Sequence, residues 1–275
     1  MAIDREVADH YSRDDLAAVI LKALEAAGKD TSRLTVEDLA QVDEFHARGR
    51  PATAELASAL GLTPGTRVLD VGCGIGGPSR YVAATFGCQV VGIDLTEEYC
   101  RVATLLADKV GLGDRVEFRQ GNALAMPFED ASFDAAYTQH VAMNIEDKAA
   151  LYAEVARVLK PGARFGIYDL LQGDGGDVLF PVPWARDASI SFLVDPAELR
   201  SLLEAAGFEI SSWRDTTAQA RLWADQVKAR MAEPAPPPTA LQLQFGDDAK
   251  PMAQNVFRNL LEGRVVPIEV ICRKS

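Results

Sequence analysis

A glycine-rich turn and a distant carboxylate stand where the chain could hold a small ligand. The turn is Asp70-Val-Gly-Cys-Gly-Ile-Gly-Gly77, and Asp94 follows Gly74 by twenty residues. Glycines make a tight turn and let the backbone approach a ligand closely. A carboxylate at the end of the next strand can accept hydrogen bonds from both hydroxyls of a ribose. By itself this pattern suits a dinucleotide equally well, and its structural alternative is an ordinary turn beside an incidental acid.

Alternating apolar runs and helical periods predict the elements that position these residues. Strands are expected at 67–71, 89–93, 116–119, 133–138, 164–168, 208–213 and 268–272. Helices are expected at 14–28, from Thr35, and over 52–60, 77–86, 96–110, 148–159 and 195–207. This alternation indicates an α/β fold, a doubly wound and mostly parallel seven-stranded sheet. Ligands bind such sheets at the carboxyl ends of the strands, where Asp70 and Asp94 lie.

The two ends of the chain add further parts. Residues 1–60 read as a helical N-terminal cap, and residues 61–275 as the main domain. Residues 217–263 form an insertion before the last strand, interrupted by the proline-rich break Pro234-Ala-Pro-Pro-Pro238. Insertions of this length are often lids or substrate-binding elements.

Composition limits the classes of partner. The 28 Lys and Arg residues against 40 Asp and Glu residues leave a net charge of −12, with 48% hydrophobic residues. A negative surface argues against nucleic acid and anionic membranes as partners. The four cysteines form no C-x-x-C pair, so neither a metal site nor a disulfide framework is expected. Without a signal peptide or a long apolar run, a cytoplasmic enzyme is the expectation.

Further motifs follow the glycine-rich turn in a fixed order. After Asp70-Val-Gly-Cys-Gly74 and Asp94 come Gly121-Asn-Ala123 and Asp130-Ala-Ser-Phe-Asp134. The series continues with Glu154-Val-Ala-Arg-Val-Leu-Lys-Pro-Gly162 and Glu204-Ala-Ala-Gly-Phe208 and spans roughly residues 64–215. This ordered set resembles the class I S-adenosylmethionine-dependent methyltransferases. The lead-in Asp43-Glu-Phe-His46 looks most like the small-molecule branch, with its sarcosine/dimethylglycine N-methyltransferases and, more distantly, quinone C-methyltransferases. The resemblance implies a Rossmann-like methyltransferase fold and S-adenosylmethionine as cofactor.

The resemblance also implies roles for individual residues. Gly72, Cys73 and Gly74 would pack against the amino-acid part of the cofactor, and Asp70 would fix its ammonium directly or through water. Asp94 would hold the ribose hydroxyls, and Leu95 would flank the adenine. Asn122, where the family usually has Asp, would lie near the adenine amino group, and Ala123 would supply a backbone amide. Gln139 would offer its backbone carbonyl to the ammonium, and Tyr11 would cover the cofactor.

The sequence offers several candidate residues for binding or activating the methyl acceptor, each with a structural alternative. His140, after the fourth strand, is the first candidate for a base or a positioning group, and His46 in the lead-in is the second. Their alternatives are a polar loop residue and a helix cap. Trp184 is a candidate wall of the acceptor pocket or a core residue. Arg48 and Arg186, like Arg50, are candidate partners of a substrate carboxylate or ordinary surface cations.

The predicted function is methyl transfer from S-adenosylmethionine to a small molecule. The leading acceptor is a small amine or amino acid such as sarcosine or dimethylglycine. The first alternative is O- or C-methylation of an apolar metabolite such as a quinone or prenyl compound. The second is a non-catalytic module that binds the cofactor. An arginine facing the acceptor would favour the amino acid, and an apolar pocket would favour the apolar metabolite.

Overall fold

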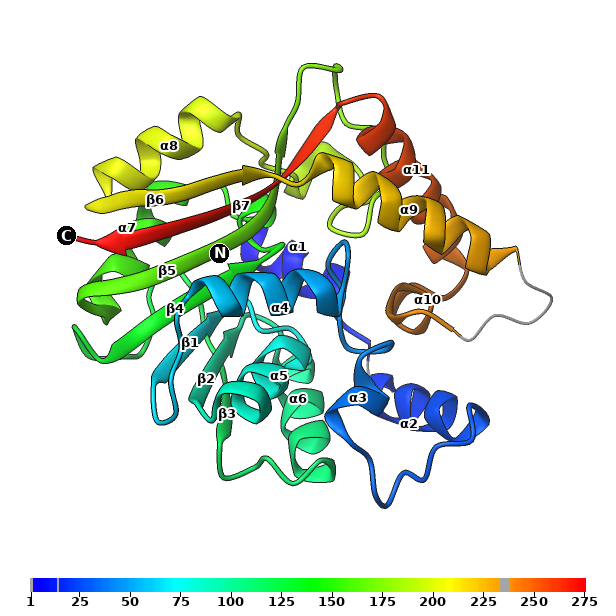
Figure 1. The fold of residues 1–275 in the computed structure, drawn as a ribbon. Helices are drawn as coiled ribbons and strands as arrows, with labels where there is room; N and C mark the ends of the chain where they lie inside the picture. Colours follow the sequence, from blue (N-terminus) through cyan, green and yellow to red (C-terminus); the bar gives the residue numbers. More distant parts are fainter. Residues whose placement is uncertain (1, 14, 233–237) are drawn as a thin grey trace.

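A computed structural model describes residues 2–13, 15–232 and 238–275. The centre is a sheet of seven strands in the order β3-β2-β1-β4-β5-β7-β6 (Figure 1). The strands are β1 (Arg67–Val71), β2 (Gln89–Asp94), β3 (Val116–Gln120), β4 (Phe133–Gln139), β5 (Leu159–Gln172), β6 (Phe208–Asp215) and β7 (Val265–Lys274). Pairing is parallel except along β7, which is antiparallel to both β5 and β6. The predicted α/β sheet is confirmed, with a longer fifth strand than expected.

Helices cover both faces of this sheet. On one face lie α4 (Arg50–Ala59), α5 (Gly77–Phe86) and α6 (Glu97–Lys109), and on the other lie α7 (Lys148–Val158) and α8 (Pro196–Ala205) (Figure 1). Each face has its own apolar core, built around Val68 and Tyr168 on the first and around Leu69 and Val155 on the second. Neighbouring strand residues alternate between the two cores because side chains alternate along a strand.

Short capping signals in the sequence fix two of the helix starts. Thr35 and Asp38 form the predicted capping box of α3 (Val36–Leu39), with the Thr35 hydroxyl accepting from the Asp38 backbone N–H at 3.2 Å. The Asp195 carboxylate accepts from the backbone N–H groups of Ala197 and Glu198, and Pro196 is the first residue of α8. These side chains satisfy backbone donors that a helix leaves free at its start.

The carboxyl ends of β1, β2 and β4 meet where the strand order reverses. Val71 pairs with Ile93 on one side and with Thr138 on the other. Asp94 and Gln139, the last residues of β2 and β4, therefore flank the turn that follows β1. This is the edge at which sheets of this type bind ligands.

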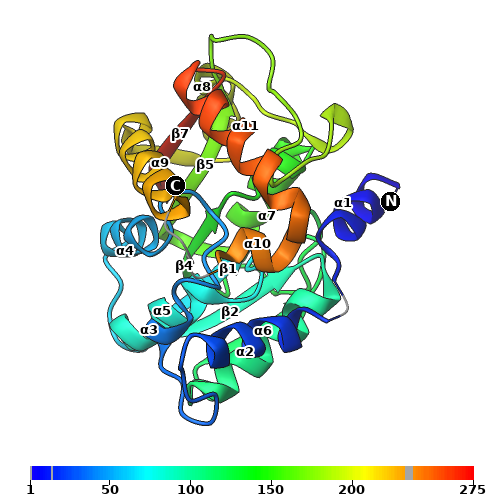
Figure 2. The same ribbon diagram turned by 90° about the vertical axis from the view of Figure 1, so that its right-hand side faces the viewer.

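Segments from both ends of the chain gather at that edge. They are α1 (Ala2–Tyr11) and α2 (Leu16–Ala26) at the start, and α9 (Thr217–Met231), α10 (Ala240–Phe245) and α11 (Ala249–Leu261) of the insertion (Figure 2). The Gln244 side-chain amide donates to the Tyr11 carbonyl at 2.6 Å, which joins α10 to the end of α1. Within the predicted proline-rich break, residues 234–237 lie outside the described residues.

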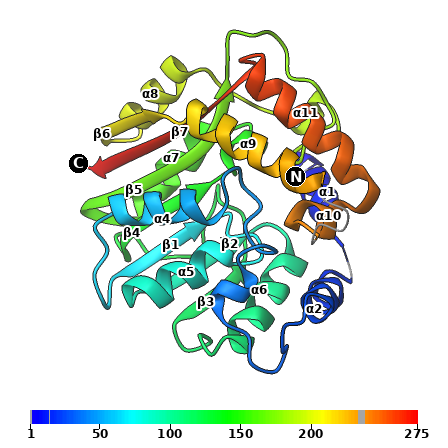
Figure 3. The same cartoon turned by 45° about the vertical axis from the view of Figure 1, so that its right-hand side comes forward.

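The helix α1 is not among the elements that the sequence predicts. Ile3, Val7 and Tyr11 recur at four-residue spacing and line the cavity, and Val7 packs against a cluster that includes Trp184 and Leu260. This apolar face lies beside α10 (Figure 3). No helix among the residues described is long and apolar enough to cross a bilayer.

Candidate active site at the carboxyl edge of the sheet

A cavity of about 820 Å³ opens at the carboxyl edge of the sheet, beneath α1 and the insertion. Every residue predicted to bind the cofactor lines it: Tyr11, Asp70, Gly72, Cys73, Gly74, Asp94, Leu95, Asn122, Ala123 and Gln139. His46, His140 and Trp184 line it as well. Arg48 and Arg186 are not among its lining residues.

Asp94 is fixed to the glycine-rich turn. One carboxylate oxygen accepts from the Gly74 backbone N–H at 2.9 Å, and the other accepts from the Thr96 backbone N–H at 2.9 Å. Burial raises the pKa of Asp94, while these backbone hydrogen bonds act in the opposite direction. A carboxylate has about four lone-pair positions, so each oxygen can still accept a hydroxyl from a ligand.

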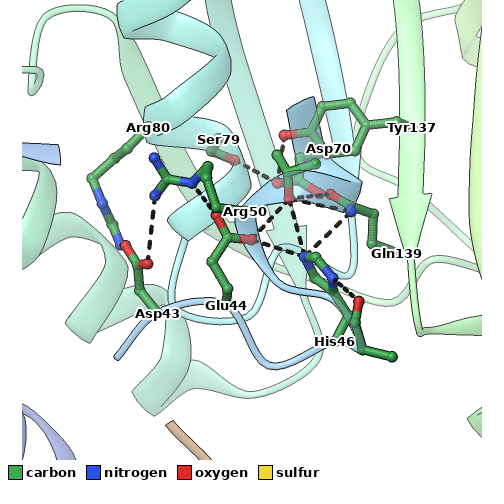
Figure 4. Close-up of polar contacts among 11 residues, drawn as sticks. Asp43, Glu44, His46, Arg50, Asp70, Ser79, Arg80, Tyr137 and Gln139 are labelled. Carbon is green, nitrogen blue, oxygen red and sulfur yellow. Dashed lines mark hydrogen bonds and ion pairs between the residues drawn. The ribbon is translucent and has the colours of Figure 1, made fainter. Parts of the chain in front are cut away.

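Asp70 lies beneath the same turn. One of its oxygens accepts from the Ser79 hydroxyl at 2.6 Å and from the Tyr137 hydroxyl at 2.8 Å (Figure 4). Burial raises the pKa of Asp70 to about 7, although these two hydrogen bonds lower it. The carboxyl group is therefore near half-ionised at neutral pH and responds strongly to a cation placed beside it.

Two glycines of the turn have different reasons to lack a side chain. Gly72 has a φ of 73°, and a Cβ there would collide with the Val141 side chain. Gly74 has a φ of 53°, and a Cβ there would meet nothing within 4 Å. Gly72 thus permits the close packing of the turn, whereas Gly74 leaves open space beside Asp94.

Asn122 and α1 form another part of the cavity wall. The Asn122 amide donates to Asp4 of α1 at 3.3 Å, and its carbonyl accepts from the Leu124 backbone N–H at 2.9 Å. The Tyr11 hydroxyl donates to the Asn144 carbonyl oxygen at 2.9 Å. The N-terminal helix is therefore attached across the cavity by two amide side chains.

A buried polar network connects the lead-in to β4 (Figure 4). His46 Nε2 lies 2.8 Å from Glu44 Oε2, 3.1 Å from the Thr53 hydroxyl and 3.3 Å from the Gln139 amide nitrogen. Its Nδ1 lies 3.1 Å from the Ala47 carbonyl. Both ring nitrogens of His46 are therefore engaged. The resemblance implies a role for the Gln139 backbone, and the structure adds that the Gln139 side chain is held by this network.

Charged pairs extend the network to α5. Arg50 donates to Glu44 at 2.5 Å, and Arg80 donates to Asp43 at 2.9 Å. The side chains of Asp43 and Arg80 are fully buried, which is rare for charged groups unless they are paired. Burial raises the pKa of Glu44, but hydrogen bonds from His46 and Arg50 leave that pKa below its usual value.

His140 differs from His46 in that its ring forms no hydrogen bond with the described residues. Nε2 is buried and has no hydrogen-bond partner in the described part of the chain. The ring stacks on Tyr168 with centroids 5.2 Å apart, and the backbone N–H donates to the Tyr168 carbonyl at 2.8 Å. Burial and the neighbouring His46 lower the pKa of His140 well below its usual value. The imidazole is therefore neutral at pH 7, and it is a weaker base than an exposed histidine.

The predicted acceptor-side residues differ in whether they line the cavity. Trp184 is buried on the cavity wall, and its indole N–H donates to the Ser191 hydroxyl at 2.9 Å. Arg48 donates to Glu55, and Arg186 is exposed and paired with Asp248 at 2.9 Å. Arg50 lines the cavity but is engaged by Glu44. In each arginine the guanidinium already has a carboxylate partner within the chain.

Three contributors escape prediction from the sequence. Glu44 and Thr53 hold His46, and Asn144 joins Tyr11 to the backbone of the Trp184 segment, donating to the Trp184 carbonyl at 2.7 Å. Glu44 lies within the lead-in Asp43-Glu-Phe-His46, and its place two residues before His46 is the one sequence signal that could have indicated its role. Nothing in the local sequence distinguishes Thr53 or Asn144 from a surface polar residue.

The donor set fits S-adenosylmethionine. Asp94 retains acceptor capacity for two hydroxyls beside the open space at Gly74. The cofactor carries a sulfonium and an ammonium, and the carboxylates Asp43, Glu44, Asp70 and Asp94 line this end of the cavity. Arg50 also lines this end but is engaged by Glu44, so the carboxylates that remain unpaired can attract a cationic ligand. No group of His, Cys, Asp and Glu that could hold a metal occurs among the described residues.

Comparison with known proteins agrees with this site. Residues 69–167 match the family model described as "Methyltransferase domain". The sterol 24-C-methyltransferase ERG6B of Gibberella zeae is 36% identical over 171 residues, which cover 59% of this chain and 44% of that protein. The methyltransferase phqN of Penicillium fellutanum is 33% identical over 170 residues, covering 60% and 52%. The chain thus spans about half the length of these relatives.

Solved structures share the fold. A geranyl diphosphate methyltransferase bound to GPP and sinefungin aligns with a TM-score of 0.74 at 19% identity, covering all of both chains. Phosphoethanolamine N-methyltransferase 2 of Haemonchus contortus, bound to S-adenosyl-L-methionine, also gives 0.74 at 20% identity, covering 98% of this chain and 60% of that one. Residues 69–167 of the chain thus match a methyltransferase domain, and the chain shares its fold with these solved methyltransferases.

Proposed function

We propose that this chain transfers a methyl group from S-adenosylmethionine to a carbon atom of an apolar small molecule. The observation that carries the proposal is the wall of the cavity away from Asp94. There α9 and α11 contribute Trp223, Val227, Val256 and Phe257, and the segment after β5 contributes Trp184. Such a wall fits a large apolar body better than sarcosine or dimethylglycine.

The sequence relatives support the same choice. The sterol 24-C-methyltransferases act on carbon, as their name states, and are 36–40% identical to this chain in the matched segments. The arginines considered for a substrate carboxylate are engaged by carboxylates of the chain itself. These two observations favour the apolar alternative over the amine that the sequence placed first.

His140 is the base in this proposal. S-adenosylmethionine supplies a methyl group already activated by a positively charged sulfur. A carbon that gains this methyl group through a double bond must afterwards lose a proton, so a neutral acceptor is needed on the cavity wall. Nε2 of His140 has no partner in the described chain, whereas both nitrogens of His46 are engaged. His46 is then a positioning residue, which holds Gln139 in place.

The experiment is a labelled-methyl assay with matched acceptors. Purified protein is incubated with S-adenosylmethionine carrying a ¹³C methyl group and, in turn, with a side-chain-unsaturated sterol, a prenyl alcohol, sarcosine and dimethylglycine. We expect S-adenosylhomocysteine and a new carbon-bound methyl signal in the organic extract of an apolar acceptor. A methyl signal only on the amines would support the amine alternative. Absence of turnover with every acceptor, despite cofactor binding, would support a non-catalytic module.

A further inference from the structure

The insertion gives the cavity a second end whose charge is opposite to that of the cofactor end. Arg230 and Lys250 line it, and none of the other described lining residues of the insertion is a carboxylate. The cofactor end is instead lined by carboxylates, including Asp70 and Asp94, and Arg50, which also lines it, is paired with Glu44. A wall of carboxylates suits a cationic cofactor, and a wall with two cations suits an anion.

The two cations occupy equivalent positions on two neighbouring helices. α9 and α11 run in opposite directions, as the colours of Figure 1 show, and Trp223 packs against Phe257 with ring centroids 6.2 Å apart. Arg230 follows Trp223 by seven residues, and Lys250 precedes Phe257 by seven. Seven residues are nearly two helical turns, about 10 Å along the axis. Each cation therefore lies on the face of its aromatic residue, and both lie toward the outer end of the pair.

Neither cation forms an ion pair or a hydrogen bond within the described chain, unlike the other basic residues that these helices carry outside the cavity. Lys228 lies 3.8 Å from Asp225, and Arg258 lies 3.1 Å from Glu262. Arg221 donates to the carbonyls of Leu260 and Leu261. Arg230 is half-buried beside the cavity, where an anion would find a partner that is partly removed from water.

We propose that the methyl acceptor is an amphipathic acid. Its apolar body lies against Trp223 and Phe257, and its anionic group, a carboxylate or a phosphate, lies between Arg230 and Lys250. The inference rests on the proposed function of the cavity. It also separates this acceptor from a small amino acid, because the aromatic pair and the cations are about 10 Å apart along the helices, a length that sarcosine cannot span.

Binding of head-group variants on one chain length tests the proposal without requiring turnover. Dodecanoate, dodecyl phosphate and dodecanol are titrated below their aggregation limits into protein saturated with S-adenosylhomocysteine. Binding is followed by tryptophan fluorescence, to which the cavity residues Trp184 and Trp223 contribute together with Trp213 outside the cavity. We expect at least one of the two anions to bind about tenfold or more tighter than dodecanol, since a hydrogen bond to a charged group contributes more than a neutral one. Whichever anion binds tighter identifies the head group.

The double variant Arg230→Ala/Lys250→Ala should lose this preference while it keeps its affinity for dodecanol. Arg258→Ala is the matched control, because Arg258 lies on α11 outside the cavity and is paired with Glu262. It should keep the preference. Equal binding of all three probes by the unaltered protein, or a preference that survives in the double variant, would overturn the proposal. Either of these results would still allow methyl transfer to a neutral apolar acceptor. Conversely, a failure of turnover with every acceptor would contradict the proposed function without altering the binding result.

Discussion

The carboxylate of Asp94 accepts a hydrogen bond from the Gly74 backbone N–H at 2.9 Å, so the end of β2 is fixed to the turn that follows β1. The contact orients both oxygens beside open space in the cavity. A ribose placed there would find an acceptor whose position is set before binding, which reduces the ordering cost of the complex.

Replacing Asp94 should therefore weaken S-adenosylmethionine binding strongly. We expect Asp94→Ala to raise the dissociation constant about 10- to 100-fold, since hydrogen bonds to a charged acceptor are worth about 1.5–3 kcal/mol. Calorimetric titration measures the change. Asp114→Ala, which removes an exposed carboxylate beyond α6, is the control and should bind as the unaltered protein does. An Asp94→Ala protein with unchanged affinity would remove Asp94 from the cofactor site.

Cofactor affinity should depend on pH through Asp70. Its pKa is raised to about 7 by burial, and a bound cation favours the ionised form. The carboxyl group is therefore mostly protonated at pH 6 and mostly ionised at pH 8, so affinity should rise over this interval and binding near pH 7 should release a proton. Titrations in buffers with different ionisation enthalpies detect that proton. In Asp70→Asn the pH dependence should disappear; if it persists, another group is responsible.

Removal of His140 should affect turnover rather than cofactor binding. We expect His140→Ala to lower kcat by about 10²–10⁴-fold, the usual contribution of a positioned base, with the dissociation constant of S-adenosylmethionine unchanged. Because burial lowers the pKa of His140, kcat at saturating S-adenosylmethionine should not fall down to about pH 6.5, the ordinary pKa of histidine. A variant that methylates at the normal rate would exclude His140 as the base.

The buried pair of Asp43 and Arg80 should be a major contributor to folding. Arg80→Met leaves the buried Asp43 carboxylate with only the more distant Arg50, 3.8 Å away, as an ion-pair partner, which we expect to lower the free energy of unfolding by about 3 kcal/mol. Denaturant titration provides the value. The double variant Asp43→Leu/Arg80→Met removes both charges and should recover part of that loss. Equal destabilisation in the single and double variants would mean that packing, and not the stranded charge, is the cause.

The local sequence is sufficient to predict the scaffold, and the resemblance to a known family adds the cofactor end of the site. Strand ends, glycines and capping residues act over a few neighbouring positions, so the residue pattern alone places Asp70, Gly74 and Asp94 on one edge. The parallel sheet then brings the ends of β1, β2 and β4 together through its strand order alone. The ten residues that the family resemblance implies for the cofactor, including Tyr11 of α1, line one cavity.

The acceptor end could not be predicted in this way. His46 and Gln139 are 93 residues apart, and they meet only because the lead-in packs against the end of β4. In the sequence both histidines are candidates for a base or a positioning group. Tertiary packing engages both ring nitrogens of His46 and leaves Nε2 of His140 without a partner among described residues. Arg48 and Arg186 are equally plausible in the sequence, yet each lies beside a carboxylate elsewhere.

The sequence by itself thus determined the α/β sheet, the cofactor turn and its acids, because these depend on local propensity and on strand order. Only the tertiary structure decided which side chains form the second half of the cavity. That wall comes from α1, α9 and α11, at opposite ends of the chain, and its composition depends on how these helices dock on the sheet. Docking is set by long-range packing, which no local pattern of residues encodes.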